Sequence, residues 1–265
     1  MQRDVTSRIV IDVTEKAELV FAVAVAAVHA DVREELSVTV DGEPIDVDEL
    51  ADAHGGRLHR VAPREGRLVL DYAAHIAGPA GPLATDATDL LVYRRPSRYA
   101  ESDALAPTAG AEFAGVAGDR EVLTAVSSWV GTHLSYVPGS SLPTDGAERT
   151  LLARQGVCRD YAHLCVALLR ARGIPARLAA VYAPGLDPMD FHAVAEAWVE
   201  GAWHVVDATT LAPRSSLVRI ATGRDAADTA FLNVLSGRAD LVDVTVTATA
   251  DELPPDDLDI LVALS

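Results

Sequence analysis

The spacing of apolar residues changes along this chain, and that change constrains the fold more than any other feature. Up to about residue 95, apolar and polar positions alternate in short runs, and Asp41-Gly42 is typical of a tight hairpin turn. From Asp119 to Arg172, apolar residues instead recur every three or four positions, and short alternating runs return after Pro175. Strands followed by helices and then by further strands predict an α+β fold.

The same pattern suggests how the 265 residues divide. Several short strands at regular spacing predict a β-sandwich over residues 1–95. Residues 96–118 are rich in Pro, Ala and Gly and are expected to form a connector. Residues 119–265 then form a second domain, with helices packed on a mostly antiparallel sheet. The strands of that sheet are expected at 176–182, 191–199, 202–208, 217–221 and 241–248.

The strongest predicted helix spans 158–172, and it begins with a cysteine. Gly173 and Pro175 are its stop signals. The unpaired N–H groups and positive dipole at a helix start favour the thiolate form of Cys158. Taken alone, a free cysteine is more often an inert core residue than a nucleophile.

The spacing of a later hairpin brings a histidine to an aspartate. If Glu200-Gly201 is the turn, facing residue numbers sum to 401, and Trp198 then pairs with Trp203. In this register Asp207 is the diagonal neighbour of His192, at about 7–8 Å between Cα atoms. An imidazole–carboxylate hydrogen bond fits that separation. The same sequence is also compatible with a structural reading, in which His192 is a strand-end residue and Asp207 begins a turn.

Three ordered motifs resemble the transglutaminase-like superfamily, and in particular its bacterial cysteine-protease-like branch with a β-rich N-terminal region. They are residues 156–164 (GVCRDYAHL), 172–177 (RGIPAR) and 190–193 (DFHA), followed by 203–209. The resemblance implies a papain-like core in which Cys158 is the nucleophile, His192 the general base and acid, and Asp207 the residue that orients the histidine. Val194 and Ala208 depart from the family pattern, in which an aromatic residue and a proline are usual.

The implied activity is cysteine-dependent acyl transfer on peptide or isopeptide-like amides through a thioester. Hydrolysis is favoured over cross-linking, because no calcium-site pattern of clustered acidic residues is evident. An amine-accepting transglutaminase and a catalytically idle binding module remain alternatives, the latter disfavoured because all three reacting groups are present. The second oxyanion donor is left open among Tyr136, Ser140 and Ser141.

Neither a cofactor nor a metal is expected. The spacings of Cys158, His163, Cys165 and His192 match no usual zinc pattern, and Cys165 is expected to be a core thiol.

Charge limits the partners. The formal net charge of −17 argues against a nucleic acid and against an anionic membrane surface. The longest apolar run, 19–28, is far shorter than the ~20 residues that span a bilayer, and the N-terminus lacks a signal-peptide pattern. We therefore expect a cytoplasmic protein that acts on a peptide, protein or small amide. The sequence does not indicate an oligomeric state.

Overall fold

One long strand, β1 (Gln2–Phe21), organises the N-terminal part of this computed structural model, which describes residues 1–81 and 83–264. Residues 2–13 of β1 pair with β6 (Gly66–Ala80), whereas residues 19–21 pair with β5 (Arg57–Val61). Between these stretches, register shifts from Val13 to Leu19 interrupt the pairing of β1 on its other side. The strand bends at these bulges and passes from one layer to the other.

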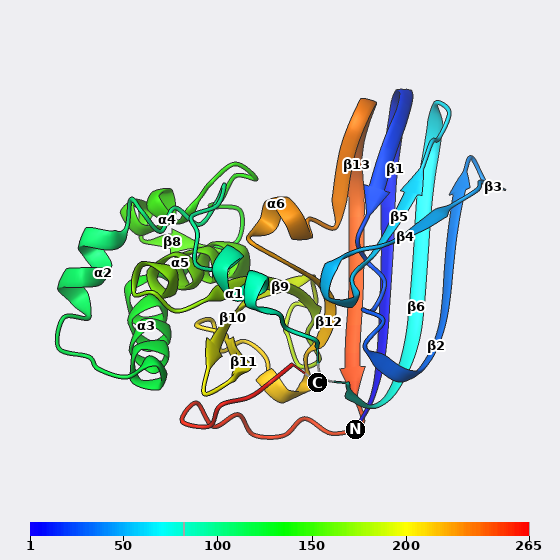
Figure 1. The fold of residues 1–265 in the computed structure, drawn as a ribbon. Helices are drawn as coiled ribbons and strands as arrows, with labels where there is room; N and C mark the ends of the chain where they lie inside the picture. The colour runs from blue at the N-terminus through cyan, green and yellow to red at the C-terminus, as the bar shows by residue number, and fades with distance from the viewer. Residues whose placement is uncertain (82, 265) are drawn as a thin grey trace.

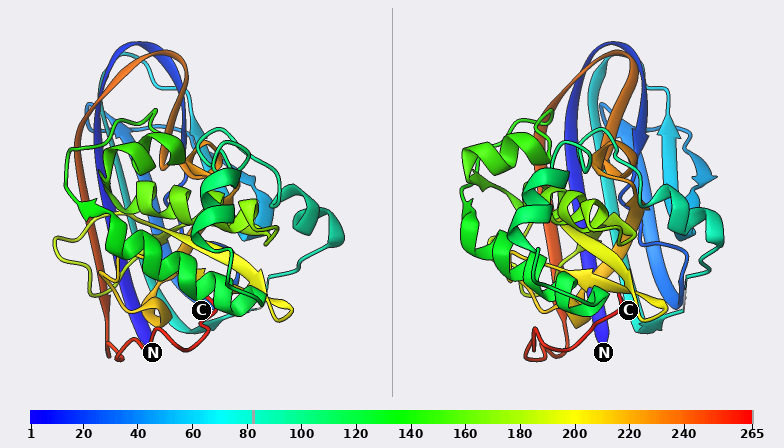
Figure 2. Two further views of the ribbon diagram at one scale, coloured as in Figure 1. Left: turned by 90° about the vertical axis from the view of Figure 1, so that its left-hand side faces the viewer. Right: turned by 60° about the vertical axis from the view of Figure 1, so that its left-hand side comes forward.

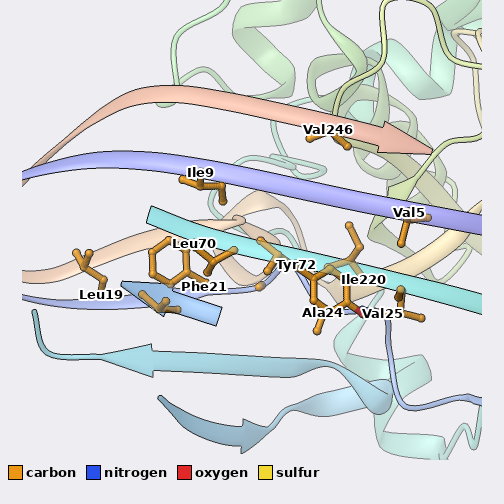
Figure 3. Close-up of a cluster of buried hydrophobic side chains, with 14 of the residues drawn as sticks. Val5, Ile9, Leu19, Phe21, Ala24, Val25, Leu70, Tyr72, Ile220 and Val246 are labelled. Atoms are coloured by element: carbon orange, nitrogen blue, oxygen red, sulfur yellow. The ribbon is translucent and has the colours of Figure 1, made fainter. Parts of the chain in front are cut away.

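The expected sandwich is therefore made from one continuous sheet that folds over on itself. Its strand order is β3-β2-β6-β1-β5-β4, where the remaining strands are β2 (His29–Val40), β3 (Glu43–Pro44) and β4 (Asp48–Ala51). Leu19 and Phe21 of the second layer share a buried cluster with Ile9 and Leu70 of the first (Figure 3). The strands extend beyond the helical part in both further views (Figure 2).

The last strand, β13 (Leu232–Ala250), belongs to this N-terminal sheet. It runs antiparallel to β1 from Arg3 opposite Ala250 to Phe21 opposite Leu232, and the two lie side by side in Figure 1. The sequence prediction that 241–248 would join the second sheet is wrong. Alternation shows that a strand has one buried face, but it does not show which sheet supplies the partner.

The helical core matches the sequence prediction more closely. Helices α3 (Asp119–His133), α4 (Ala147–Ala153) and α5 (Cys158–Ala171) form where periodicity predicted them. The α5 helix packs on a four-stranded antiparallel sheet of order β11-β10-β9-β12. Its strands are β9 (Ala176–Tyr182), β10 (His192–Val199), β11 (Ala202–Val206) and β12 (Val218–Gly223). The α+β class is thus confirmed.

The segment 96–118 is part of the core and not a loose connector. It contains α2 (Ala106–Glu112), and Leu105, Ala109 and Phe113 are buried against the helical core. A further short helix, α1 (Ala87–Val92), precedes it inside the region expected to be all-β. Few apolar anchors are visible in the sequence here, but Leu105, Ala109 and Phe113 are buried and Val116 is partly buried.

The sheet and the helical core share buried contacts. The Tyr182 hydroxyl at the end of β9 donates to Val23 O at 2.8 Å and lies 3.0 Å from Ser7 Oγ. Ile220 of β12 lies in the same cluster as Tyr72 of β6 (Figure 3). Among the described residues, no helix is long and apolar enough to cross a membrane.

Candidate active site

Cys158 is the first residue of α5 and is partly exposed, whereas Cys165, two turns along the helix, is buried. The chain enters the helix through β8 (Gln155–Gly156), where Gly156 lies against the Asp160 side chain. A Cβ at position 156 would stand 2.6 Å from Asp160 Cβ. Only glycine therefore allows this close approach just before the cysteine.

Asp160 secures the start of the helix. Its buried carboxylate accepts the Val157 N–H at 2.8 Å and the Ser141 hydroxyl at 2.9 Å. Arg159 donates to Ser141 Oγ and to Leu142 O. Beyond a general effect on the helix dipole, Asp160 thus ties the loop before α4 to the backbone beside Cys158.

The hairpin has the predicted register. Trp198 pairs with Trp203 and Val199 with Ala202, so facing numbers sum to 401. His192 Nε2 lies 3.0 Å from Asp207 Oδ2, and both side chains are buried. The other carboxylate oxygen, Oδ1, accepts both the backbone N–H and the hydroxyl of Thr209.

The pKa values of this pair move apart. Burial by itself lowers the pKa of His192, but the Asp207 carboxylate and the neighbouring Cys158 outweigh burial and raise it to about 10. Burial raises the pKa of Asp207, yet the His192 charge and the bonds from Thr209 bring its pKa below its ordinary value. The structure therefore favours an imidazolium beside a carboxylate.

Cys158 completes the cluster. Its thiol is close enough to His192 to contribute to the raised pKa of the imidazole. Because Nε2 is bonded to Asp207, Nδ1 is the nitrogen left for the sulfur, and it has no hydrogen-bond partner within 1–81 and 83–264. The structure joins His192 to Asp207, and Cys158 is the thiol that acts on the pKa of this histidine.

The candidates for a second oxyanion donor differ in their surroundings. Tyr136 of β7 (Ser135–Tyr136) packs its ring against Tyr161 of α5, and burial, followed by the charge of Cys158, raises the pKa of its phenol to about 12. The Ser140 hydroxyl donates to Val137 O at 2.8 Å, and the Ser141 hydroxyl is bound to Asp160. Sequence reasoning named this set but had no signal to choose within it.

His163 contacts Ala226 and Tyr99 rather than the His192–Asp207 pair. It is fully buried, and its Nε2 accepts the N–H of Ala226 at 3.1 Å. Its ring stacks on Tyr99, and burial lowers its pKa to about 3. The loop that precedes α6 (Ala226–Thr229) thus packs against α5, and His163 has a packing role. In the described part of the chain, no three His, Cys, Asp or Glu side chains are grouped so as to hold a metal.

Comparisons with known proteins show which family this chain resembles in sequence and fold. A family model described as the transglutaminase-like superfamily matches residues 108–208. A candidate cysteine protease of known structure from Cytophaga hutchinsonii is 32% identical, with a TM-score of 0.87 over 97% of this chain and 93% of its own.

Two curated relatives are uncharacterized mycobacterial proteins. The Mycobacterium leprae protein is 29% identical over 58% of this chain and 59% of its own length. The Mycobacterium bovis protein is 37% identical over 48% of this chain and 41% of its own length. The chain thus matches about half the length of these curated relatives.

Proposed function

Since the chain belongs to the transglutaminase-like superfamily, we propose that it is a cysteine-dependent hydrolase of peptide or isopeptide-like amides, with Cys158, His192 and Asp207 as its catalytic triad. The observation that carries the proposal is the buried His192–Asp207 pair, joined at 3.0 Å, beside a partly exposed cysteine at a helix start. The proposal includes a cytoplasmic location for the protein, which is the location expected from the sequence.

The first half of the reaction forms a thioester. The Cys158 thiolate attacks the amide carbonyl carbon, and the carbonyl oxygen becomes an oxyanion near the Cys158 backbone N–H. The imidazolium of His192 gives its proton to the amide nitrogen, the C–N bond breaks, and the amine leaves. Asp207 balances the positive charge of the ring before this transfer and orients it throughout.

The second half consumes the thioester. His192, now neutral, takes a proton from a water molecule whose oxygen attacks the thioester carbonyl. The C–S bond breaks, which releases a carboxylic acid and restores the Cys158 thiolate beside the imidazolium. An amine in place of water would instead give a new amide, so hydrolase and transferase share every step but this one.

A substrate screen with an active-site control tests the proposal. We expect the purified protein to hydrolyse members of a peptide or γ-glutamyl amide library and Cys158→Ala to show no turnover. Added amine should divert only a minor part of the product. A product that is mainly transamidated would make the protein a transglutaminase. Full activity in Cys158→Ala would reject the mechanism.

Alkylation tests the nucleophile without a substrate. Iodoacetamide near neutral pH should modify Cys158 much faster than Cys165, because burial raises the pKa of the Cys165 thiol and closes it to solvent. Mass mapping that finds Cys165 modified first would contradict the assignment. An unreactive Cys158 together with no turnover would favour the idle binding module.

A further inference from the structure

A cavity of about 510 Å³ lies on the sheet of the helical core. Small-molecule sites in proteins commonly have this volume. All four strands of the sheet contribute to its wall, through Arg177 of β9, Glu196 and Trp198 of β10, Trp203 of β11 and Arg219 of β12.

The cavity is separate from the proposed catalytic residues. Side chains alternate along a strand, so His192, Val194 and Glu196 point from the same face of β10. Glu196 is four residues from His192, which is about 13 Å along the strand. Val194 lies between them and is buried in an apolar cluster with Val181 and Val205. A ligand in the cavity would therefore not occupy the place beside His192.

Two donors of Arg177 have no acceptor. Arg219 donates through Nη1 and Nη2 to the two oxygens of Glu196, at 2.8 and 2.7 Å, which is the paired arrangement typical of arginine and a carboxylate. Arg177 donates to Glu196 through Nε, at 2.8 Å. Its Nη1 and Nη2 are buried, and they have no hydrogen-bond partner within 1–81 and 83–264. The end of Arg177 thus lacks the carboxylate that the end of Arg219 has.

The aromatic rings around Arg177 do not replace this acceptor. The Trp203 ring centroid lies 4.0 Å from the Arg177 Cζ, and the Tyr93 centroid lies 5.9 Å from it. Such rings stabilise the positive charge of a guanidinium. The N–H groups of Nη1 and Nη2 still need hydrogen-bond acceptors, because buried polar groups are normally paired.

The charges at the cavity do not balance. Arg177 and Arg219 bring two positive charges, and Glu196 brings one negative charge to both of them. Among the described residues that line the cavity, Glu196 is the only acid. One positive charge therefore remains, although the chain as a whole has a formal net charge of −17. A single monovalent anion would balance the cavity.

We propose that this cavity binds a small organic carboxylate, whose two oxygens accept hydrogen bonds from Nη1 and Nη2 of Arg177. The apolar body of the ligand packs against the side chains that form the rest of the wall, which include Val28, Leu83, Trp198, Trp203 and Leu264. An inorganic anion could pair with Arg177 but would leave these apolar side chains without a partner. The inference does not depend on the proposed catalytic function.

Tryptophan fluorescence of the wild-type protein tests the ligand class, because Trp198 and Trp203 are two of the three tryptophans in the chain. Phenylacetate and hexanoate should each give a saturable change. We expect phenylacetate to bind at least about 10-fold more tightly than phenylacetamide, which has the same shape without the charge. Saturation by neither acid, equal affinity for acid and amide, or tighter binding of inorganic phosphate would each overturn the inference.

Blocking the thiol distinguishes this cavity from the proposed catalytic site, where a carboxylic acid could bind as a product. Carboxamidomethylation of Cys158 should leave the affinity for phenylacetate unchanged. Loss of phenylacetate binding after this modification would assign the binding to the catalytic site and overturn the inference, while leaving the proposed function intact.

Arg177→Gln is the variant that tests the contact. It removes the two unpaired donors and leaves Arg219 balanced by Glu196. We expect phenylacetate to bind at least about 10-fold more weakly. Arg238→Gln, which removes an exposed positive charge on β13, should bind like wild type. Wild-type affinity in a folded Arg177→Gln protein would contradict the proposal.

A crystal of the wild-type protein with 4-bromophenylacetate gives the answer if Arg177→Gln does not fold. The anomalous signal of bromine should lie in the cavity beside Trp203. Bromine found at other places and not in this cavity would reject the site.

Discussion

At the scale of single residues, Thr209 decides how Asp207 meets His192. Its N–H and hydroxyl both donate to Asp207 Oδ1, at 2.9 and 2.6 Å, which leaves Oδ2 for His192 Nε2. An acceptor at this place keeps a proton on Nε2, so in the proposed triad Nδ1 is the nitrogen that exchanges a proton with the sulfur. Thr209 therefore orients the carboxylate that His192 meets.

Asp207→Asn should consequently disturb the proton pattern more than the shape. The Thr209 donors select the asparagine oxygen, so its NH₂ group faces Nε2 and favours the neutral tautomer with the proton on Nδ1. The pKa of His192 should fall as the negative charge is lost. We expect kcat/KM to drop by about 10²–10⁴-fold, and the pH profile of Cys158 alkylation to move to higher pH.

Asp190→Asn is the matched control for this change. It removes the same charge two residues before His192, where the carboxylate is exposed and accepts the Phe191 N–H. Its alkylation profile should stay near that of wild type. If Asp207→Asn alkylates like wild type from pH 5 to 9, Asp207 does not control the histidine.

At the scale of elements, the approach of β8 to α5 depends on a glycine. Gly156→Ala would place a methyl group 2.6 Å from Asp160 Cβ and 2.8 Å from its Oδ2. The helix start must shift to accept it, at a cost of about 1–3 kcal/mol in unfolding free energy. We expect a lower melting temperature and a slower Cys158 alkylation.

Gly110→Ala in α2 provides the comparison. A Cβ there meets nothing within 4 Å, so the change should leave alkylation unaltered and stabilise the protein by roughly 0.5–1 kcal/mol through helix propensity. A Gly156→Ala protein that melts and reacts like wild type would mean that the contact with Asp160 is not tight.

The strands of the second sheet are joined by a buried ion triad. Arg177 of β9 and Arg219 of β12 both donate to the Glu196 carboxylate of β10, at 2.7–2.8 Å. Burial raises the pKa of Glu196, but the two guanidinium groups outweigh burial and lower it to about 2. The Trp203 ring covers the Arg177 guanidinium, 4.0 Å from its Cζ.

Glu196→Gln should leave two buried cations without a counter-charge. We expect a loss of about 3–5 kcal/mol in unfolding free energy near pH 7, measured by chemical denaturation. Because the folded pKa of Glu196 is depressed, its contribution is fully present above its ordinary value of 4.5 and is lost as the pH falls toward 2.

The difference in unfolding free energy between Glu196→Gln and wild type should therefore become smaller below about pH 4.5. The control is Glu200→Gln at the exposed hairpin turn. We expect this change to lower the unfolding free energy by less than about 0.5 kcal/mol. Equal stability of Glu196→Gln and wild type at pH 7 would show that the triad contributes no net stabilisation.

At the scale of the whole molecule, the last strand of the chain pairs with the first. The β13 strand pairs with β1 after the helical core is complete, and Tyr182, Val218 and Ile220 of the second sheet lie in the same buried cluster as the N-terminal strands. Residues 1–95 and 119–265 therefore do not separate into units with independent cores.

Thermal unfolding tests this integration. We expect one cooperative calorimetric transition for the whole chain, because neither part can bury its apolar surface alone. A protein limited to residues 1–95 should show no cooperative melt, since β1 has lost β13 along its length. Two separate transitions, or a cooperatively folded 1–95 fragment, would restore the division into two domains.

The sequence by itself determined the features that depend on near neighbours. The helix that begins at Cys158, the 401 register of the hairpin and the meeting of His192 with Asp207 follow from helical periodicity and from one turn at Glu200-Gly201. These features are local because hydrogen bonding along a helix or across a tight hairpin joins residues a few positions apart.

Only the tertiary structure decided the features that depend on distant partners. The pairing of β13 with β1 and the burial of Phe113 both require contacts between separate elements. An alternating strand carries the same pattern whichever sheet it joins, and an aromatic residue in a Pro- and Ala-rich segment does not show what will cover it. Packing of the completed chain settles both, since an apolar face gains free energy only from the partner that buries it.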